Sequence, residues 1–242
     1  MIEILQWSTV ATCAALAGAR VPSALRGENR TVFSIFALLT LAILLSIDGP
    51  YVAIDRALAG INLANLILRF LIFAAIYFVG IRVTKGFGAE DAHRLITGRA
   101  GIAVLALVSV AVVVLFLLMD TAGSSSGLKA VALRDARNGL LAELYGAAGR
   151  AYPAYVSLVL LPAMVRAVRS ALPAPVRFAA LLLAAGAVAI ALTLLFPLVP
   201  AQWGAVLFIV NYTAVLCFVA GLALIWIARI RSGHRLPRAK DL

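Results

Sequence analysis

Apolar residues occur along this chain in long runs, separated by short segments that carry charges, prolines and glycines. An α-helix of about 20 apolar residues is long enough to cross a bilayer. The pattern therefore predicts a single all-α integral membrane domain over residues 1–242, with seven transmembrane helices and no loop long enough to fold separately. The predicted spans are residues 2–19, 31–47, 62–83, 101–119, 138–168, 178–198 and 203–228.

Composition supports a membrane environment. The mean hydropathy is +1.07, and only 13% of the residues are charged, whereas soluble domains have about 25%. The lipid bilayer is therefore the expected surrounding, and bacterial plasma (inner) membrane the expected location. The net charge of +11 would suggest nucleic acid in a soluble protein, but membrane proteins gather Lys and Arg in cytoplasmic loops, so no nucleic-acid partner is expected.

The Lys and Arg residues also predict the orientation. Two of the 21, Arg69 and Arg150, lie inside predicted spans, and four lie in the loops on one side: Arg56, Lys129, Arg134 and Arg137. The other fifteen lie in the alternate loops and the C-terminal tail. Positively charged loops stay in the cytoplasm, which predicts an outside N-terminus and a cytoplasmic C-terminus.

The first apolar segment leaves one alternative. No basic residue precedes it, and Arg20, Arg26 and Arg30 follow it, which is opposite to a secretory signal. We therefore interpret it as an uncleaved span. The alternative is a cleaved signal ending in the small residues 15–19, which would leave six spans.

Several classes of function are excluded by absent or misplaced residues. Both histidines, His93 and His234, fall in predicted cytoplasmic segments, which excludes an intramembrane bis-histidine haem or metal centre. Every lysine lies outside the apolar cores, which excludes a retinal Schiff base. No paired-carboxylate, GxSxG or HExxH motif occurs. We predict no enzyme activity, no catalytic residues, no metal and no cofactor.

Polar side chains gather at similar depth in the predicted outer half of three spans. Charged residues at such depth usually pair with one another or face a water-filled cavity. The candidate ligand or ion-pair site consists of Asn65, Arg69, Glu143, Arg150, Asn211 and Tyr212. We expect Arg69, Glu143 and Arg150 to form one buried network between the third and fifth spans. The alternative is a structural role, in which these groups only hold the helices together.

The second and third spans carry a loose motif, Pro50-Tyr51, Ile54-Asp55, Gly60 and Asn62-Leu-Ala. In these residues the chain resembles a group of uncharacterised actinobacterial seven-span membrane proteins that are described as candidate transporters. Members of the group tend to carry histidine where this chain has Arg69. The resemblance implies the seven-span architecture and a transport function.

Two functional hypotheses follow. The first is a small-solute transporter or channel with a polar site in the outer half of the bundle. The second is a non-transporting sensor or assembly subunit that acts through a protein partner at the basic cytoplasmic face. The inner halves of the predicted spans contain few polar residues, so the preference for transport is slight.

Overall fold

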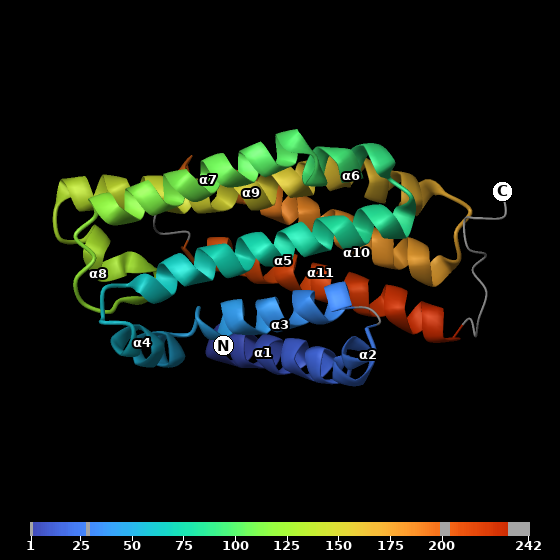
Figure 1. The fold of residues 1–242 in the computed structure, drawn as a ribbon, viewed down its shortest axis with the longest axis horizontal. Coiled ribbons are helices and arrows are strands. Elements are labelled where there is room, and N and C mark those ends of the chain that lie inside the picture. Colours follow the sequence, from blue (N-terminus) through green and yellow to red (C-terminus); the bar gives the residue numbers. More distant parts are fainter. Residues whose placement is uncertain (1, 28–29, 199–203, 232–242) are drawn as a thin grey trace.

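The computed structural model describes residues 2–27, 30–198 and 204–231, and every regular element in these ranges is helical (Figure 1). The predicted all-α class is thus confirmed. The elements are α1 (Ile2–Gly18), α2 (Val21–Leu25), α3 (Arg30–Leu44), α4 (Asp48–Ala57), α5 (Leu63–Phe87), α6 (Glu90–Thr97), α7 (Arg99–Leu118), the 3₁₀ turn η1 (Ser126–Leu128), α8 (Lys129–Ala132), α9 (Ala136–Arg169), α10 (Ala174–Leu192), the 3₁₀ turn η2 (Thr193–Leu198) and α11 (Gly204–Arg231).

The long helices lie side by side along one axis and alternate in direction (Figure 1). The short helices α4 and α8 lie at one end of the bundle, and α2 and α6 lie at the other. Helix α9 packs against α5, α7 and α10, and therefore forms much of the core. Its Tyr145, Tyr152 and Leu160 side chains are fully buried.

Within the described residues, four helices are long and apolar enough to cross a membrane: Leu63–Phe87, Arg99–Leu118, Ala136–Arg169 and Ala174–Pro197. A fifth candidate is the pair α3 and α4, which is bent by 92° at a short break. Among the described residues the structure thus supports four to five of the seven predicted spans. Helix α1 has 17 residues, fewer than the roughly 20 that a full span requires.

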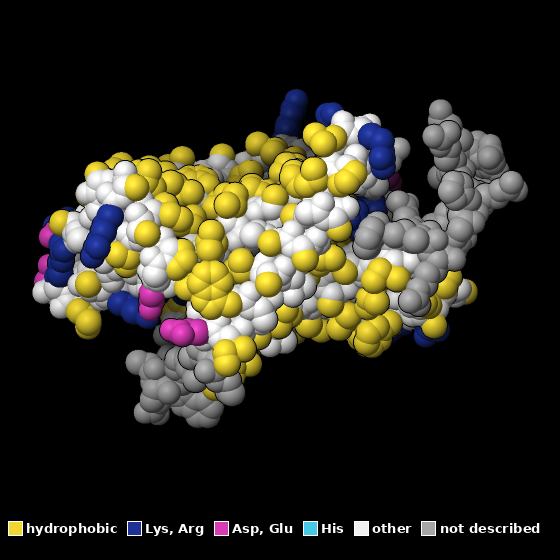
Figure 2. All heavy atoms as spheres, turned by 90° about the horizontal axis from the view of Figure 1, so that it is seen from below, with side chains coloured by type: hydrophobic (Ala, Val, Ile, Leu, Met, Phe, Trp, Pro, Cys, Tyr) yellow, Lys and Arg dark blue, Asp and Glu magenta, His cyan; other side chains and the backbone are white. Residues whose placement is uncertain are grey.

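Helix α7 shows that apolar side chains cover the outside of the bundle. Its most apolar window has a mean hydropathy of 3.1, yet only 17% of that window is buried. Leu107 and Leu117 are 72% and 73% exposed. In Figure 2 hydrophobic side chains cover the flank, and charged side chains gather toward the two ends. A helix that is apolar all round and mostly uncovered is suited to a lipid surrounding, as expected of a membrane-embedded protein.

The connection after α3 corrects one sequence prediction. The predicted second span ends at residue 47 and the third begins at residue 62, which predicts a loop from Asp48 onward. The helix does end at Leu44, but α4 begins at Asp48 and continues to Ala57. Pro50 lies in the first turn of α4, where the missing N–H is not needed because that turn has no intrahelical acceptor.

The predicted third span ends at residue 83 and the fourth begins at residue 101, which predicts a loop over 84–99, but this segment contains a helix. Helix α5 extends to Phe87, four residues beyond its predicted end, and stops where Gly88 adopts a left-handed φ of 65°. Helix α6 then starts with Glu90 and Asp91, whose negative charges suit the positive end of a helix dipole.

Close helix contacts explain why small residues occur in the C-terminal part. A Cβ atom on Gly221 of α11 would lie 2.8 Å from Cγ of Leu183 on α10, and one on Gly186 would lie 3.0 Å from Cδ2 of Phe218. Only glycine permits this approach. Van der Waals packing of this kind is a main source of helix association in lipid.

Candidate functional site

Asn62 joins the α4–α5 connection to the loop after α7. It is fully buried, and its left-handed φ of 59° is one that asparagine tolerates better than most residues. Its Oδ1 accepts hydrogen bonds from the Tyr51 hydroxyl (2.8 Å) and the Ser125 N–H (2.9 Å). Its Nδ2 donates to the carbonyls of Thr121 (2.9 Å) and Gly123 (2.7 Å). The amide group therefore makes four hydrogen bonds, which fills its capacity.

Asp55 fixes the first turn of α5. Its buried carboxylate accepts hydrogen bonds from the N–H groups of Asn62 (3.0 Å) and Ala64 (3.0 Å) and from the Ser124 hydroxyl (2.7 Å). Because the start of α5 is held in this way, the position of Arg69, about 9 Å further along the helix, is set as well.

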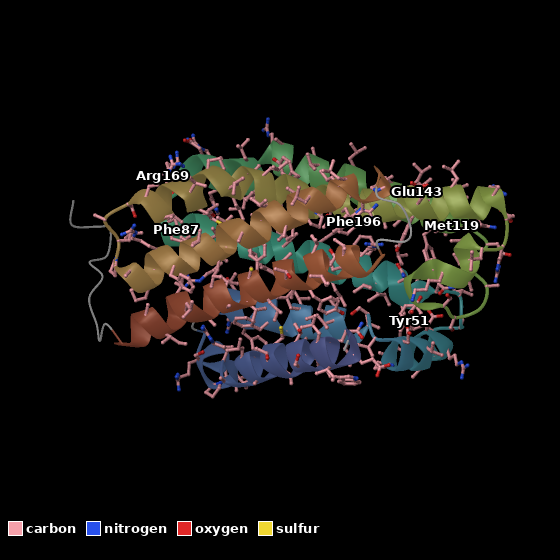
Figure 3. The ribbon with its side chains drawn as sticks, turned by 180° about the vertical axis from the view of Figure 1, so that it is seen from behind. Tyr51, Phe87, Met119, Glu143, Arg169 and Phe196 are labelled. Carbon is pink, nitrogen blue, oxygen red and sulfur yellow. The ribbon has the colours of Figure 1, made fainter. Side chains whose placement is uncertain are left out.

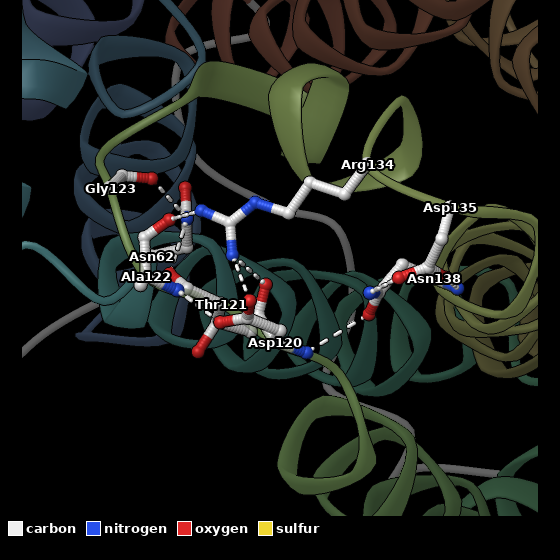
Figure 4. A network of polar contacts seen from close by, with 8 residues as sticks. All are labelled: Asn62, Asp120, Thr121, Ala122, Gly123, Arg134, Asp135 and Asn138. Atoms are coloured by element: carbon white, nitrogen blue, oxygen red, sulfur yellow. Dashed lines mark hydrogen bonds and ion pairs between the residues drawn. The ribbon is translucent and has the colours of Figure 1, made fainter.

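A second polar network fixes the start of α9 (Figure 4). The Asn138 side chain accepts a hydrogen bond from the Asp120 N–H (2.9 Å), and the Asn138 N–H donates to Asp135 (2.7 Å), which caps the helix. Arg134 forms an ion pair with Asp120. The hydrogen bond from Arg134 lowers the pKa of Asp120, and the hydrogen bond from the Asn138 N–H lowers the pKa of Asp135.

Three of the six predicted site residues line one cavity of about 380 Å³ at this end of the bundle. Arg69 comes from α5, and Glu143 and Arg150 come from α9. The other lining residues are Gly127, Leu128, Ala142, Tyr145, Gly146, Phe196 and Pro197. Figure 3 labels Glu143 and Phe196 at this end, on α9 and η2.

Each arginine side chain lies against a glycine of α9. The Arg69 guanidinium carbon is 5.1 Å from the centre of the Tyr145 ring. A Cβ atom on Gly149 would lie 2.8 Å from Cδ of Arg69. Arg150 turns back along its own helix, so that its Nη1 would lie 3.3 Å from a Cβ on Gly146. Both guanidinium groups can approach the backbone of α9 this closely because glycine has no side chain at these two positions.

The two arginines are not paired with an acid. Among the described residues, no carboxylate oxygen lies within 4.0 Å of either guanidinium. The Nε of Arg69 and the Nε of Arg150 are both buried and donate to no acceptor. Glu143 is exposed. The three residues therefore share a cavity without the expected ion pair.

The other three candidates lie elsewhere. Asn65 is buried one turn before Arg69, and its Oδ1 has no hydrogen-bond partner. Asn211 is exposed on α11. Tyr212 is buried, with its hydroxyl 3.0 Å from the Ser46 hydroxyl at the α3–α4 break. None of the three lines the cavity that holds Arg69.

A second cavity, of about 610 Å³, lies at the opposite end of the same two helices. Its lining includes Phe87 at the end of α5, Glu90 and Asp91 of α6, and Ala163 and Arg166 of α9. Figure 3 labels Phe87 and Arg169 at this end, away from Glu143. This cavity was not predicted from the sequence, where the charged, glycine-containing segment after the third predicted span is the one feature that could have indicated it.

In the part of the chain that the structure describes, no group of three His, Cys, Asp or Glu side chains is placed to hold a metal ion. The candidate site thus consists of two guanidinium groups, one carboxylate and two aromatic rings around a small cavity. Such a site suits binding of a polar or charged group.

No protein-family model, curated protein or solved structure matches this chain. Function must therefore be inferred from the geometry of the site.

Proposed function

We propose that the protein is a multi-pass transporter of the bacterial plasma (inner) membrane, with seven spans and an outside N-terminus, that moves a small solute along the contact between α5 and α9. The observation that carries the proposal is the pair of cavities at opposite ends of these two helices. Arg69 and Arg150 line one cavity, and Phe87 and Ala163 line the other.

The two cavities lie in line along α9. Arg150 is the last residue of α9 in the first cavity and Ala163 is the first in the second. The distance between them along the helix is about 20 Å. A carrier needs a site that is reached in turn from each side, and this arrangement offers one vestibule on each side.

Between the cavities the two helices are closed. Phe73 of α5 and Tyr152 of α9 pack edge to face, with ring centroids 5.6 Å apart. Further along, a Cβ on Gly80 would lie 3.2 Å from Cγ1 of Val156. The structure therefore corresponds to an occluded state in this proposal, and transport requires α5 and α9 to separate.

Helix α9 contains the features that would allow this movement. Pro153 and Pro162 lie inside it, the first within the closed region beside Tyr152 and the second beyond it, toward the second cavity. Each proline lacks an N–H, which leaves the carbonyls of Gly149 and Leu158 without their helical donors, and helices bend most readily at such positions.

Flux measurements in vesicles test the proposal. Purified protein is reconstituted into liposomes, and uptake of labelled glucose, glutamate, succinate and inorganic phosphate is followed. We expect uptake of at least one of these solutes that depends on the protein. Tyr152→Leu should raise the flux because it shortens the side chain that closes the contact, whereas Leu107→Ala, on the lipid-facing side of α7, should not change it. Absence of flux for every solute, with both variants folded, would contradict the proposal.

The competing hypothesis is a non-transporting sensor or assembly subunit. The closed contact around Tyr152 favours it, since a receptor needs access from only one side. This hypothesis expects no flux, and a stoichiometric partner protein that co-purifies through the basic cytoplasmic loops.

The seven-span topology has its own test. A reporter that is active only in the cytoplasm is fused to either terminus. We expect activity at the C-terminus alone. Activity at the N-terminus would contradict the proposed orientation, and loss of the first segment from the mature protein would support six spans.

A further inference from the structure

We infer that the cavity lined by Arg69 and Arg150 binds an anionic group, a carboxylate or a phosphate, which lies between the two guanidinium groups. The inference deepens the proposed function, because it names the chemical class of the solute that this cavity accepts. It also holds if the protein binds that group without transporting it.

Each of the two arginines has a buried N–H donor without an acceptor. A guanidinium carries five N–H donors in one plane. Neither Arg69 nor Arg150 has a carboxylate within 4.0 Å among the described residues, and the Nε of each is buried without an acceptor. Burying such donors without acceptors is unfavourable, and paired anionic oxygens are the acceptors that match arginine best.

Each guanidinium also lies near an aromatic ring. The Arg69 guanidinium carbon lies 5.1 Å from the Tyr145 ring, and that of Arg150 lies 5.7 Å from the Phe196 ring. The face of an aromatic ring attracts a guanidinium, but it does not provide hydrogen-bond acceptors for the N–H groups in the guanidinium plane. These contacts hold each cation in place, and the buried Nε donor of each arginine remains without an acceptor.

The size and the charge of the cavity also suit a small anion. The cavity of about 380 Å³ falls in the lower part of the range for small-molecule sites. Two arginines and one carboxylate give its ionisable lining residues a formal charge of +1. The carboxylate, Glu143, is exposed, whereas the two arginines are half-buried. The inner part of the cavity therefore favours a small anion.

The anionic group could belong to a soluble molecule or to a lipid headgroup, and equilibrium binding separates the two sources. The full-length protein is placed in nanodiscs of phosphatidylcholine and titrated with inorganic phosphate or succinate. In a second arm, nanodiscs of mixed phosphatidylglycerol and phosphatidylcholine are used without a soluble anion, and the co-purified lipid is quantified. Saturable binding of phosphate or succinate indicates a soluble anion. Enrichment of phosphatidylglycerol that depends on both arginines indicates a headgroup.

Variants connect the binding to the cavity. Arg69→Met and Arg150→Met should each weaken binding by at least about tenfold, since each removes a charge-assisted contact. Arg69→Lys keeps the charge but loses the paired donors, and should recover only part of the affinity. Arg56→Met is the matched control, because Arg56 is exposed on α4 at the same end and does not line the cavity. It should bind as the unchanged protein does.

Glu143→Gln gives a gain that misfolding cannot imitate. It removes the one carboxylate among the described lining residues, so anion affinity should rise a few-fold. The inference is overturned if neither anion nor lipid binds, or if Arg69→Met and Arg150→Met bind as tightly as Arg56→Met. Flux of glucose alone, without anion binding, would overturn the inference and leave the transport proposal standing. Anion binding without flux would do the reverse.

Discussion

Replacing Asn62 by alanine should destabilise the protein more than any exposed polar substitution, because it removes four hydrogen bonds at once. The bonds reach Tyr51, Thr121, Gly123 and Ser125 over distances of 2.7–2.9 Å. A typical intramolecular hydrogen bond contributes about 0.5–1.5 kcal/mol. Four of them give about 2–6 kcal/mol, a large share of a total stability that is usually about 5–15 kcal/mol.

The backbone adds a second, separable effect. Asn62 has a φ of 59°, a conformation that costs alanine about 1 kcal/mol and glycine almost nothing. Asn62→Gly loses the same four bonds without this strain. We therefore expect Asn62→Ala to be about 1 kcal/mol less stable than Asn62→Gly, and both to be well below the unchanged protein.

The measurement is equilibrium unfolding in mixed micelles, followed by tryptophan fluorescence as the denaturing detergent is increased. Asn211→Ala is the matched control, because Asn211 is exposed on α11, and it should change the free energy of unfolding by less than about 0.5 kcal/mol. The reasoning is refuted if Asn62→Ala unfolds at the same detergent fraction as Asn211→Ala.

Two further predictions concern the candidate site and its support. Gly149→Ala would place a Cβ 2.8 Å from the Arg69 side chain, so it should displace that guanidinium and weaken phosphate or succinate binding about tenfold. Gly146→Ala meets only the movable tip of Arg150, at 3.3 Å, and should weaken binding less. Equal affinities of the two variants in a binding titration would contradict this expectation. The pKa values of Asp120 and Asp135 are lowered in the folded protein. The contribution of these carboxylates to the stability of the folded state is therefore complete above their ordinary pKa of 3.8, and it is lost as the pH falls through the lower pKa of the folded state. Pepsin cleavage between α7 and α9 should therefore increase below about pH 4, and a cleavage rate that does not change with pH, after correction for pepsin's own pH profile, would count against the role of these caps.

Depth along a helix was predictable from the sequence. An α-helix rises about 1.5 Å per residue whatever its surroundings, so counting from the helix ends placed Arg69, Glu143 and Arg150 at similar depth, and the structure finds them around one cavity. The length of each apolar run also predicted the long helices. The run predicted at residues 101–119 is α7, Arg99–Leu118, and the run predicted at 138–168 is α9, Ala136–Arg169.

Rotation about the helix axis was not predictable, because it depends on which helices become neighbours. Asn211 and Tyr212 have adjacent positions and nearly equal depth, yet Asn211 is exposed and Tyr212 contacts Ser46. Whether Glu143 pairs with the arginines was decided in the same way, by the directions in which α5 and α9 present their side chains.

Contacts between distant segments were decided by the tertiary structure alone. Asn62 bonds to Thr121 and Gly123, residues about sixty positions away, and nothing in the local pattern indicates that pairing. The second cavity likewise arises only because the end of α5 and the C-terminal half of α9 lie side by side. The sequence by itself determined where the long apolar helices lie and how far along each helix a polar residue falls, because apolar length and helix rise are local properties; it did not predict the short helices α4 and α6. The tertiary structure decided which polar groups meet, because that depends on the packing of helices far apart in the chain.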